Sequence, residues 1–364
     1  NAQIRGMPDA RIRILPALTE IKPTDWDACA AGGAARPEPF VSHAFLSALE
    51  SSGCAAARTG WLPQHLVVDG PDGTPSAVMP AYLKSHSRGE YVFDQGWADA
   101  YNRVGGDYYP KVQVAVPFTP VTGRRLLLKD PQDPVGQPAL AAGLKQLVRL
   151  RGASSAHITF ATQVEWEGLS QLDFLPRTDR QFHWTNAGYA TYDDFLAELA
   201  SRKRKALKKE RREALADGIT IEWQTGTDLT DEALDAFFMF YLDTGGRKWG
   251  TPYLNRELFS LLAERMPQDI LLVMARREGR YIAGALNFIG AETLYGRYWG
   301  ALEQHPFLHF EVCYHQAIDF AIARGLKVVE AGAQGEHKLA RGYLPVTTYS
   351  AHYIVNPGLK AAVA

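Results

Sequence analysis

The chain has 364 residues, of which 46% are hydrophobic and 22% charged, and its formal net charge is −1. These values indicate a globular protein of two domains or one duplicated domain, and they exclude a global electrostatic attraction to nucleic acid or membranes. The three cysteines, Cys29, Cys54 and Cys313, lie far apart without a Cys-x-x-Cys pair, which argues against a disulfide scaffold or a thiolate zinc site. Since no apolar run approaches the roughly 20 residues of a membrane helix, we expect no integral membrane segment and a cytoplasmic location.

The first half of the chain alternates predicted strands and helices. Hydrophobic periodicity and turn signals predict strands at 11–15, 65–68, 77–83, 113–116, 124–128 and 157–160, and helices at 24–30, 43–53 and 139–151. Ser42 is the candidate N-cap of the second helix. The polar segment 69–73 contains two glycines and a proline, which predicts a hairpin between the two strands that flank it.

Residues 84–123 combine many aromatic side chains with polar residues such as Asp94, Asp99, Asn102 and Arg103. Flat apolar walls with a few directed hydrogen-bonding groups suit a cleft for a polar ligand. In that case Asp94 and Asp99 would grip an acceptor molecule. A long loop whose aromatic residues pack as a small separate core explains the pattern equally well, and the sequence leaves both interpretations open.

The second half continues the alternation of elements. It predicts helices at 191–200, 230–242, 255–266 and 310–324, and strands at 219–224, 270–276, 281–289, 293–299, 327–330 and 347–355. Mixed elements of this kind along both halves predict an α+β fold with mixed sheets.

A basic run follows the helix at 191–200. In residues 202–212, eight of eleven residues are Lys or Arg. Such a run is often only the solvated face of a helix. Its density also suits the phosphates of a nucleotide-bearing cofactor, a nucleotide sugar or an RNA. The candidates for contact with phosphate or tRNA are Arg202, Arg204, Lys205 and Lys208.

The densest set of chemical groups lies between Gly332 and Pro345, where Gln, Glu, His, Lys and Arg stand beside three glycines. A strand that opens into glycines before a helix start exposes backbone N–H groups with partial positive charge. His337 or its neighbour Glu336 could move a proton there, while two cations three residues apart, Lys338 and Arg341, could hold an anion. The plainer interpretation is the solvated first turn of an ordinary helix. Glycines on both sides of the charged residues favour a functional site.

The two halves show a weak internal repeat. Each contains a helix, a strand, a Gln-x-Glu sequence at 163–165 or 334–336, and then a Leu-Pro pair. Chance similarity between common elements is the alternative. If the repeat is real, His337 and Lys338 of the second copy correspond to an aromatic and an acidic residue in the first. We therefore expect the chemistry to belong mainly to the C-terminal copy.

In its order of elements the chain resembles tandem GNAT-type acyltransferases, and among them the FemABX-like aminoacyl and acyl transferases of bacterial cell-wall synthesis. The helix entry at 195–205, the run 295–300 and the stretch 332–345 look like the proteobacterial proteins described as peptidoglycan biosynthesis or recognition proteins. The resemblance implies two GNAT-like domains related by duplication. The N-terminal domain, at 1–186, would carry a degenerate site on the acceptor side, and the C-terminal domain, at 187–364, the active site.

The resemblance further implies transfer of an acyl or aminoacyl group onto an amine, such as that of a cell-wall precursor or peptide. The catalytic candidates are Glu336 or His337, which would accept the proton of the amine, and Lys338 or backbone N–H groups at 332–335, which would stabilise the oxyanion. The candidates for binding donor or acceptor are Arg341, Arg297, Trp299, Glu311, Tyr314, Gln334, Gly335, Asp94 and Asp99. No metal is expected.

The donor stays open between acyl-CoA and aminoacyl-tRNA. Residues 300–309 lack the glycine pattern with which GNAT proteins hold the pyrophosphate of CoA, and the sequence has no long insertion of the kind that tRNA-using Fem proteins often carry. Two other functions remain as alternatives: a non-catalytic module that binds peptidoglycan precursor or peptide, and an RNA-binding protein that uses the basic helix.

Overall fold

The computed structural model describes residues 3–5, 11–249, 252–332 and 335–364. The chain divides into two compact units, the first made of Asn1–Asp179 and Thr347–Ala364 and the second of Arg180–Val346. The chain passes from one unit to the other inside β10 (Leu175–Thr185) and inside β16 (Leu344–Ile354). This division differs from the expected boundary after residue 186, because the last strand returns the C-terminus to the first unit. The roles assigned to the two predicted domains stay predictions.

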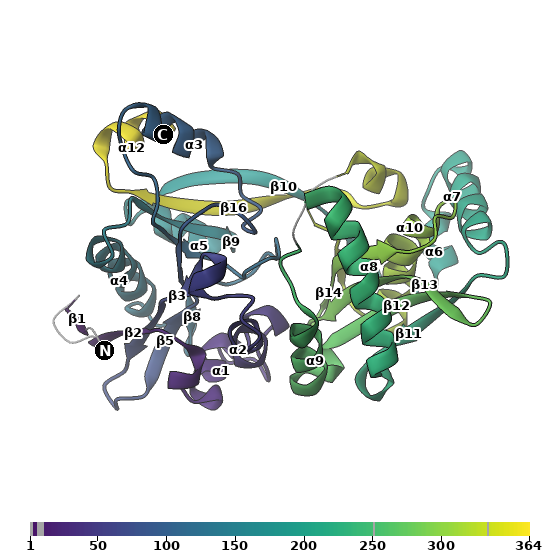
Figure 1. Cartoon of the computed structure of the whole chain (residues 1–364), viewed down its shortest axis with the longest axis horizontal. Coiled ribbons are helices and arrows are strands. Elements are labelled where there is room, and N and C mark those ends of the chain that lie inside the picture. The colour runs from purple at the N-terminus through teal and green to yellow at the C-terminus, as the bar shows by residue number, and fades with distance from the viewer. Residues whose placement is uncertain (1–2, 6–10, 250–251, 333–334) are drawn as a thin grey trace. The chain divides into compact units, whose positions relative to one another are not determined.

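The first unit contains the whole five-stranded sheet and one end of the eleven-stranded sheet (Figure 1). Besides parts of β10 and β16, its elements are β1 (Gln3–Arg5), β2 (Arg11–Leu15), η1 (Leu18–Glu20), α1 (Pro23–Ala31), η2 (Pro39–Val41), α2 (His43–Ser51), η3 (Ala57–Thr59), β3 (Trp61–Pro63), β4 (His65–Asp69), β5 (Pro75–Met79), β6 (Tyr82–Lys84), α3 (Gln95–Arg103), β7 (Lys111–Val114), β8 (Leu127–Leu128), α4 (Gly136–Leu150), β9 (Ser155–Ala161), α5 (Gln163–Ser170) and α12 (Pro357–Val363).

The strands of the first unit form one antiparallel sheet, in the order β1-β2-β4-β5-β8, and a second set in the order β3-β6-β7-β9-β16. Within the second set only β7 and β9 are parallel. Helix α4 packs against β4, β5 and β9 and contributes a row of buried aliphatic residues to the core between the two sets. As expected, the Ser42 side chain caps α2, accepting a hydrogen bond from the backbone N–H of Phe45.

The second unit is built around one sheet with helices on both faces. Besides parts of β10 and β16, its elements are α6 (Tyr192–Ala197), α7 (Ser201–Ala214), β11 (Thr220–Gln224), η4 (Gly226–Asp228), α8 (Asp231–Trp249), α9 (Arg256–Arg265), η5 (Pro267–Asp269), β12 (Ile270–Arg277), β13 (Arg280–Ile289), β14 (Thr293–Ala301), α10 (Leu308–Phe310), η6 (Glu311–His315), α11 (Gln316–Ala323), β15 (Val328–Glu330) and η7 (Glu336–Arg341).

The sheet of the second unit runs β11-β12-β13-β14-β15-β10. Its pairs are antiparallel except for β14 and β15, which are parallel. Helix α8 lies across β13 and β14 (Figure 1), where the paired residues Gly284 and Gly300 leave room for it. A Cβ atom at Gly300 would clash with the carbonyl oxygen of Phe240 in α8. The neighbouring Ala283 and Ala285 point to the other face, where they share a core with η6 and α11.

Each unit therefore contains one parallel strand pair whose strands are linked through a helix. In the first unit the pair is β7 and β9, with α4 between them in the chain, and in the second it is β14 and β15, with α10, η6 and α11 between them. This repetition agrees with the expected α+β fold of two tandem domains. Among the described residues, no helix is both long and apolar enough to span a bilayer.

Candidate functional site

The two parallel strands of the second unit separate and leave an open fork. Backbone pairing between β14 and β15 extends from Thr293 to Tyr295 and stops where β15 ends, at Glu330. Strand β14 continues to Ala301 without this partner. The fork exposes the edge of β14 beside the helical segment that connects the two strands.

A β-bulge lies at the same point of β14. Leu286 pairs with Tyr298 and Asn287 pairs with Gly296, so Arg297 is an extra residue without a cross-strand partner on β13. A bulge bends a strand and changes the direction of its side chains. Arg297 Nη2 donates to Glu330 Oε1 over 2.5 Å, and both side chains are buried. The predicted anion holder Arg297 is thus paired with a carboxylate that belongs to the protein.

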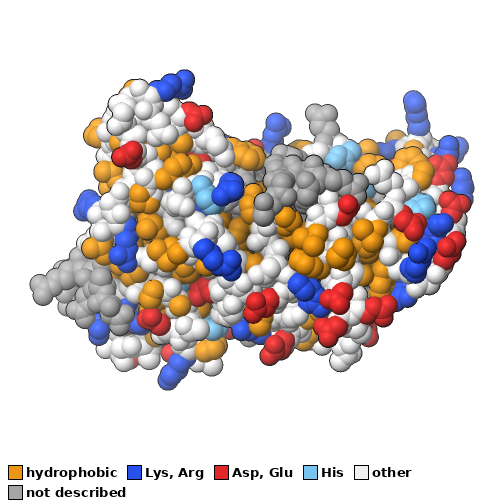
Figure 2. Space-filling model, viewed as in Figure 1, with side chains coloured by type: hydrophobic (Ala, Val, Ile, Leu, Met, Phe, Trp, Pro, Cys, Tyr) orange, Lys and Arg blue, Asp and Glu red, His pale blue; other side chains and the backbone are white. Residues whose placement is uncertain are grey.

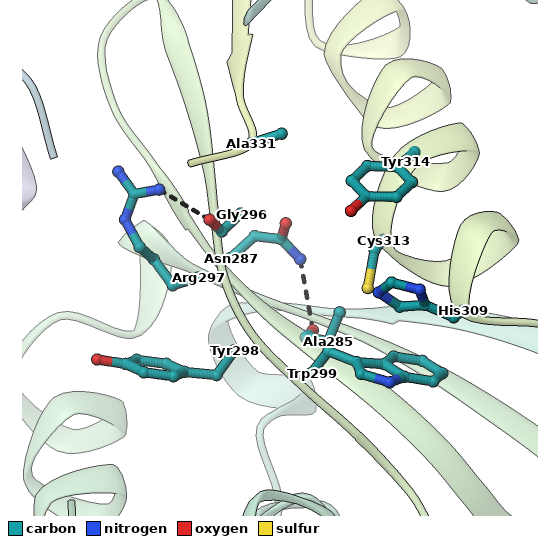
Figure 3. Close-up of a pocket in the computed structure, with 10 residues that line it drawn as sticks. All are labelled: Ala285, Asn287, Gly296, Arg297, Tyr298, Trp299, His309, Cys313, Tyr314 and Ala331. Carbon is teal, nitrogen blue, oxygen red and sulfur yellow. Dashed lines mark hydrogen bonds between the residues drawn. The ribbon is translucent and has the colours of Figure 1, made fainter. Parts of the chain in front are cut away.

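A pocket of about 120 Å³ opens at the fork (Figure 3). Its floor consists of β13 and β14, and its wall is the helical segment that begins with α10. The residues that line it are Ala285, Asn287, Gly296, Arg297, Tyr298, Trp299, His309, Cys313, Tyr314 and Ala331. The close-up shows the rings of Trp299, His309 and Tyr314 on the side of the helical segment, with the sulfur of Cys313 beside the His309 ring. Of the predicted binding residues, Arg297, Trp299 and Tyr314 meet here.

The helical wall is irregular where it meets the pocket. Residues Glu311–His315 form a turn of π-helix between α10 and α11, and Cys313 and Tyr314 belong to this turn. Single π turns inside helices are frequent at functional sites. The periodicity of the sequence predicts an uninterrupted helix over 310–324, because a one-residue shift of the hydrogen-bond ladder leaves no hydrophobic signature.

Lys338 is buried at the end of the fork, only 4% exposed. Its ammonium group donates to the carbonyl oxygens of Ala331, at 2.6 Å, and Gly332, at 3.1 Å. Among the described residues no carboxylate lies within ion-pair distance of Lys338. Burial is the main reason why the pKa of Lys338 falls from 10.5 to about 8. Ala331 also lines the pocket, so the ammonium group of Lys338 lies directly behind the part of the pocket wall that Ala331 forms.

His337 lies beside the same wall but is more exposed. Its Nε2 atom is 3.0 Å from the hydroxyl oxygen of Tyr314, and its ring also contacts Phe310. Burial and the neighbouring cations Lys338 and Arg341 lower the pKa of His337. The imidazole is therefore neutral at pH 7 and can accept a proton.

Three further predicted residues of this stretch have different outcomes. Gly335 precedes η7 with φ 113°, a conformation that favours glycine. Gln334 lies outside the described residues. The backbone of Glu336 begins η7, which is a short 3-10 turn where a longer helix start was expected, and its side chain is not described.

Arg341 and Glu311 do not line the pocket. Arg341 forms a bidentate ion pair with Glu210 of α7, with Nε and Nη2 at 2.8 and 2.7 Å from the carboxylate oxygens. Glu311 is fully buried and accepts a bidentate bond from Arg211, the next residue of α7. The expectation that these two side chains hold a ligand meets a physical obstacle, since both are occupied by partners within the protein.

The basic helix presents only part of its charge to solvent. Arg202, Lys205 and Lys208 are exposed, while Arg204 donates to backbone carbonyls at the end of α6. Lys208 forms an exposed ion pair with Asp193 at 2.8 Å. At this end of the second unit the surface carries Lys and Arg side chains interspersed with Asp and Glu side chains (Figure 2). Of the four predicted phosphate contacts, Arg202, Arg204 and Lys205 make no ion pair with a described residue, and of these three Arg202 and Lys205 are exposed.

In the first unit, Asp94 belongs to a buried polar cluster. The ammonium of Lys111 lies 2.5 Å from Asp94 and 2.6 Å from Glu90, and the hydroxyl of Tyr108 donates to Asp94 over 2.7 Å. Burial would raise the pKa of Asp94, but the charge and hydrogen bond of Lys111, together with His157 and Ser87, outweigh burial and hold this pKa below its ordinary value. Asp99 lies in α3 and is exposed.

The same cluster contains imidazoles. His157 Nδ1 and His352 Nδ1 are 2.8 Å apart and both rings are buried. The first unit therefore contains imidazoles and buried cations of its own, away from the positions that align with His337 and Lys338 in the predicted repeat. Elsewhere in the first unit, the buried residues Lys84, Lys111, His157 and His352 supply such groups.

Sequence reasoning missed Asn287 and His309 in the pocket and Glu210 behind it. Asn287 stands inside an apolar strand, and Glu210 is the only acid within the basic run 202–212. A polar residue that interrupts a uniform pattern is the signal that could have identified both. Within the described ranges, no group of three or more His, Cys, Asp or Glu side chains is arranged to hold a metal ion.

Comparisons with solved structures identify similar folds. FemX aligns over 94% of this chain and 98% of its own length, with 14% identity and a TM-score of 0.59. L-PGS from Bacillus licheniformis aligns over 87% of this chain and 92% of its own, with 10% identity and a TM-score of 0.54. The C-terminal domain of an Agrobacterium fabrum protein assigned as a lysylphosphatidylglycerol synthetase covers 88% and 89%, with 9% identity and a TM-score of 0.56. At these identities the likeness concerns the fold.

Among curated proteins, no match was found. The sequence profile of the FemAB-like family, described as peptidoglycan biosynthesis/recognition, matches residues 17–364. A match over nearly the whole chain establishes the family. The chain belongs to the FemAB-like family.

Proposed function

We propose that this chain is an N-acyltransferase that transfers an acyl or aminoacyl group to an amine of a cell-wall precursor or peptide. The reaction takes place in the pocket at the β14–β15 fork. The observation that carries the proposal is the buried ammonium of Lys338, which lies directly behind the pocket and has no carboxylate partner among the described residues. A buried charge of this kind is costly unless a ligand with the opposite charge uses it.

The charge that Lys338 can stabilise is the one that forms during acyl transfer. When the neutral amine attacks the donor carbonyl, a C–N bond forms and the carbonyl oxygen becomes an oxyanion. Lys338, or the backbone N–H groups of the adjacent turn, would stabilise that oxyanion. Its collapse breaks the bond to the leaving group, which takes up the proton that the amine releases and departs as the thiol of CoA or the 3′-hydroxyl of a tRNA.

The amine must also lose a proton. His337 is suited to this step, because its lowered pKa leaves it neutral at pH 7 and its Nε2 atom faces Tyr314 of the pocket wall. Glu336, the preceding residue, is the alternative base. The small pocket volume of about 120 Å³ fits a short acyl or aminoacyl group better than a long chain.

The donor can be either acyl-CoA or aminoacyl-tRNA. The exposed cations Arg202 and Lys205 of α7 support a donor with several phosphates, and tRNA presents more of them than CoA. The description of the family and the name of FemX support a peptidoglycan precursor as acceptor. The family is described by recognition as well as biosynthesis, so the alternative is a module that only binds such a precursor.

Transfer assays distinguish an enzyme from a binding module. Purified protein is incubated with an acceptor peptide that carries a lysine side chain, and with either ¹⁴C-acetyl-CoA or tRNA charged with a ¹⁴C-labelled amino acid. We expect transfer from one donor, and we expect Lys338→Met to reduce its kcat by about 100- to 1,000-fold, as the loss of one oxyanion donor does elsewhere. Lys327→Met is the matched control, because Lys327 is exposed and pairs with Glu292. Turnover of Lys338→Met within threefold of the control would refute the role of Lys338.

A further inference from the structure

Helix α7 has an inner face that does not fit a simple phosphate-binding role. Its outer face carries the exposed cations, whereas Leu207 and Ala214 of the inner face are buried. Between them on this inner face lie Glu210 and Arg211. Both side chains reach toward the elements that build the pocket.

Glu210 binds two of these elements at once. Its carboxylate accepts two hydrogen bonds from Arg341, at 2.8 and 2.7 Å, and a third from His315 Nε2, at 2.8 Å. Burial alone would raise its pKa, but the bonds from His315 and Arg341 outweigh burial and lower it, so Glu210 is ionised at neutral pH. His315 is itself fully buried, and its Nδ1 atom lies 2.6 Å from the hydroxyl of Tyr192.

Both partners of Glu210 are adjacent to pocket groups. Arg341 is the last residue of η7, and its Nη1 donates to the carbonyl oxygen of His337 over 2.6 Å. His315 is the last residue of the π turn and follows Tyr314 directly. Since Tyr314 and His337 are themselves 3.0 Å apart, the contacts close a ring that starts and ends at Glu210.

We propose that Glu210 is a positioning residue of the acyl-transfer pocket, which holds the turn with His337 and Lys338 against the π turn with Tyr314. This inference rests on the proposed function. Glu210 touches no substrate and acts through Arg341 and His315. Three charge-assisted hydrogen bonds that converge on one carboxylate hold together two short turns of five and six residues. Displacing reactive groups by about 1 Å can reduce a rate about 100-fold.

The first test follows Lys338 directly and does not require turnover. Each protein is labelled briefly with acetic anhydride, and the acetylation of individual lysines is measured by mass spectrometry. In Glu210→Gln we expect the labelling of Lys338, relative to the exposed Lys327 in the same molecule, to rise at least fivefold. Labelling of the buried Lys111 should not change, which excludes general loosening of the chain.

The matched control is Glu213→Gln on the same helix, whose carboxylate forms only an exposed pair with Lys209 at 3.6 Å. It should leave Lys338 labelling unchanged. Arg341→Lys keeps the charge but loses the bidentate bond, so it should reproduce the effect of Glu210→Gln. The double variant should be no worse than the stronger single variant, because both remove the same contact. If Glu210→Gln does not fold, Arg341→Lys alone decides the outcome.

Kinetics then connect position with catalysis. With the donor that supports transfer, Glu210→Gln should lower kcat at least tenfold and change KM less than threefold. Unchanged Lys338 labelling in both Glu210→Gln and Arg341→Lys, or additive effects in the double variant, would overturn the positioning role. Absence of transfer by the wild-type protein would overturn the proposed function instead, and the labelling result would still stand.

Discussion

Replacing Lys338 by methionine should remove a stability cost that the wild-type protein carries below pH 8, and it should reduce the kcat of acyl transfer by about 100- to 1,000-fold. Methionine has a similar length and volume but carries no charge, so it can occupy the same buried site. The reason for the expected gain is the burial of the ammonium, which lowers the pKa of Lys338 from 10.5 to about 8. At about 1.4 kcal/mol for each pH unit, the charged form costs the folded state about 3 kcal/mol.

The sign of the pH dependence follows from proton binding. Between pH 8 and 10.5 the unfolded chain holds the proton of Lys338, but the folded protein does not. Stability due to this group therefore rises by about 3 kcal/mol as the pH increases across this window, and it is constant below pH 8. Lys338→Met lacks this rise. At pH 7 Lys338→Met gains stability because it removes the buried charge. This gain is reduced by about 1–3 kcal/mol, because the carbonyls of Ala331 and Gly332 lose their donor.

Urea unfolding of the wild type, Lys338→Met and Lys327→Met at half-unit steps from pH 7 to pH 10 measures the effect. The difference in unfolding free energy between the wild type and Lys338→Met should shift in favour of the wild type above pH 8, whereas Lys327→Met should run parallel to the wild type. Parallel curves for all three proteins would refute the argument, because they would mean that burial of Lys338 imposes no electrostatic cost. Wild-type turnover in Lys338→Met would refute the catalytic role of Lys338.

Other groups give further predictions. Lys111→Met should cost about 3–5 kcal/mol, because two buried carboxylates lose their partner, whereas Lys327→Met at an exposed position should cost less than about 1 kcal/mol; equal losses in urea unfolding would contradict this. Burial lowers the pKa of His352 from 6.5 to about 3, so stability should fall as the pH decreases through this window, and His352→Gln should flatten the decrease in acid titrations followed by circular dichroism. Replacing both Arg202 and Lys205 by Gln should weaken tRNA binding and reduce its salt slope by about two, and an unchanged slope in filter-binding assays would rule out phosphate contact there.

The sequence predicts elements where periodicity and capping are strong. Ser42 caps its helix as expected, and the hairpin around 69–73 and the strands 270–277 and 280–289 appear close to their predicted positions. Local signals were sufficient because side-chain alternation and turn residues act over only a few positions. The position of β16 was not predictable in this way, since its assignment to the first unit depends on pairing with β9 about 190 residues earlier in the chain.

The site was predictable only as a region. Lys338 and His337 lie near the pocket, and Trp299, Tyr314 and Arg297 line it. The sequence cannot show which cations are already paired, because the partners come from distant positions, as with Arg341 and Glu210, 131 residues apart. The charge of a residue is visible in a sequence, but its remaining capacity to bind a ligand is a tertiary property.

This distinction separates the two units more clearly than the presence of particular residue types. In the first unit the buried lysines have carboxylates of the protein beside them, with Lys111 between Glu90 and Asp94 and Lys84 3.7 Å from Glu90. Their charges balance, so this cluster needs no ligand to be stable. In the second unit Lys338 is also buried, but its ammonium donates to backbone carbonyls, and among the described residues no carboxylate lies within ion-pair distance of it. The compensated cluster of the first unit is explained by its structural role, whereas an uncompensated cation beside a pocket is suited to stabilise negative charge that forms during a reaction there. For this reason we assign the chemistry to the second unit although the first contains more buried titratable groups.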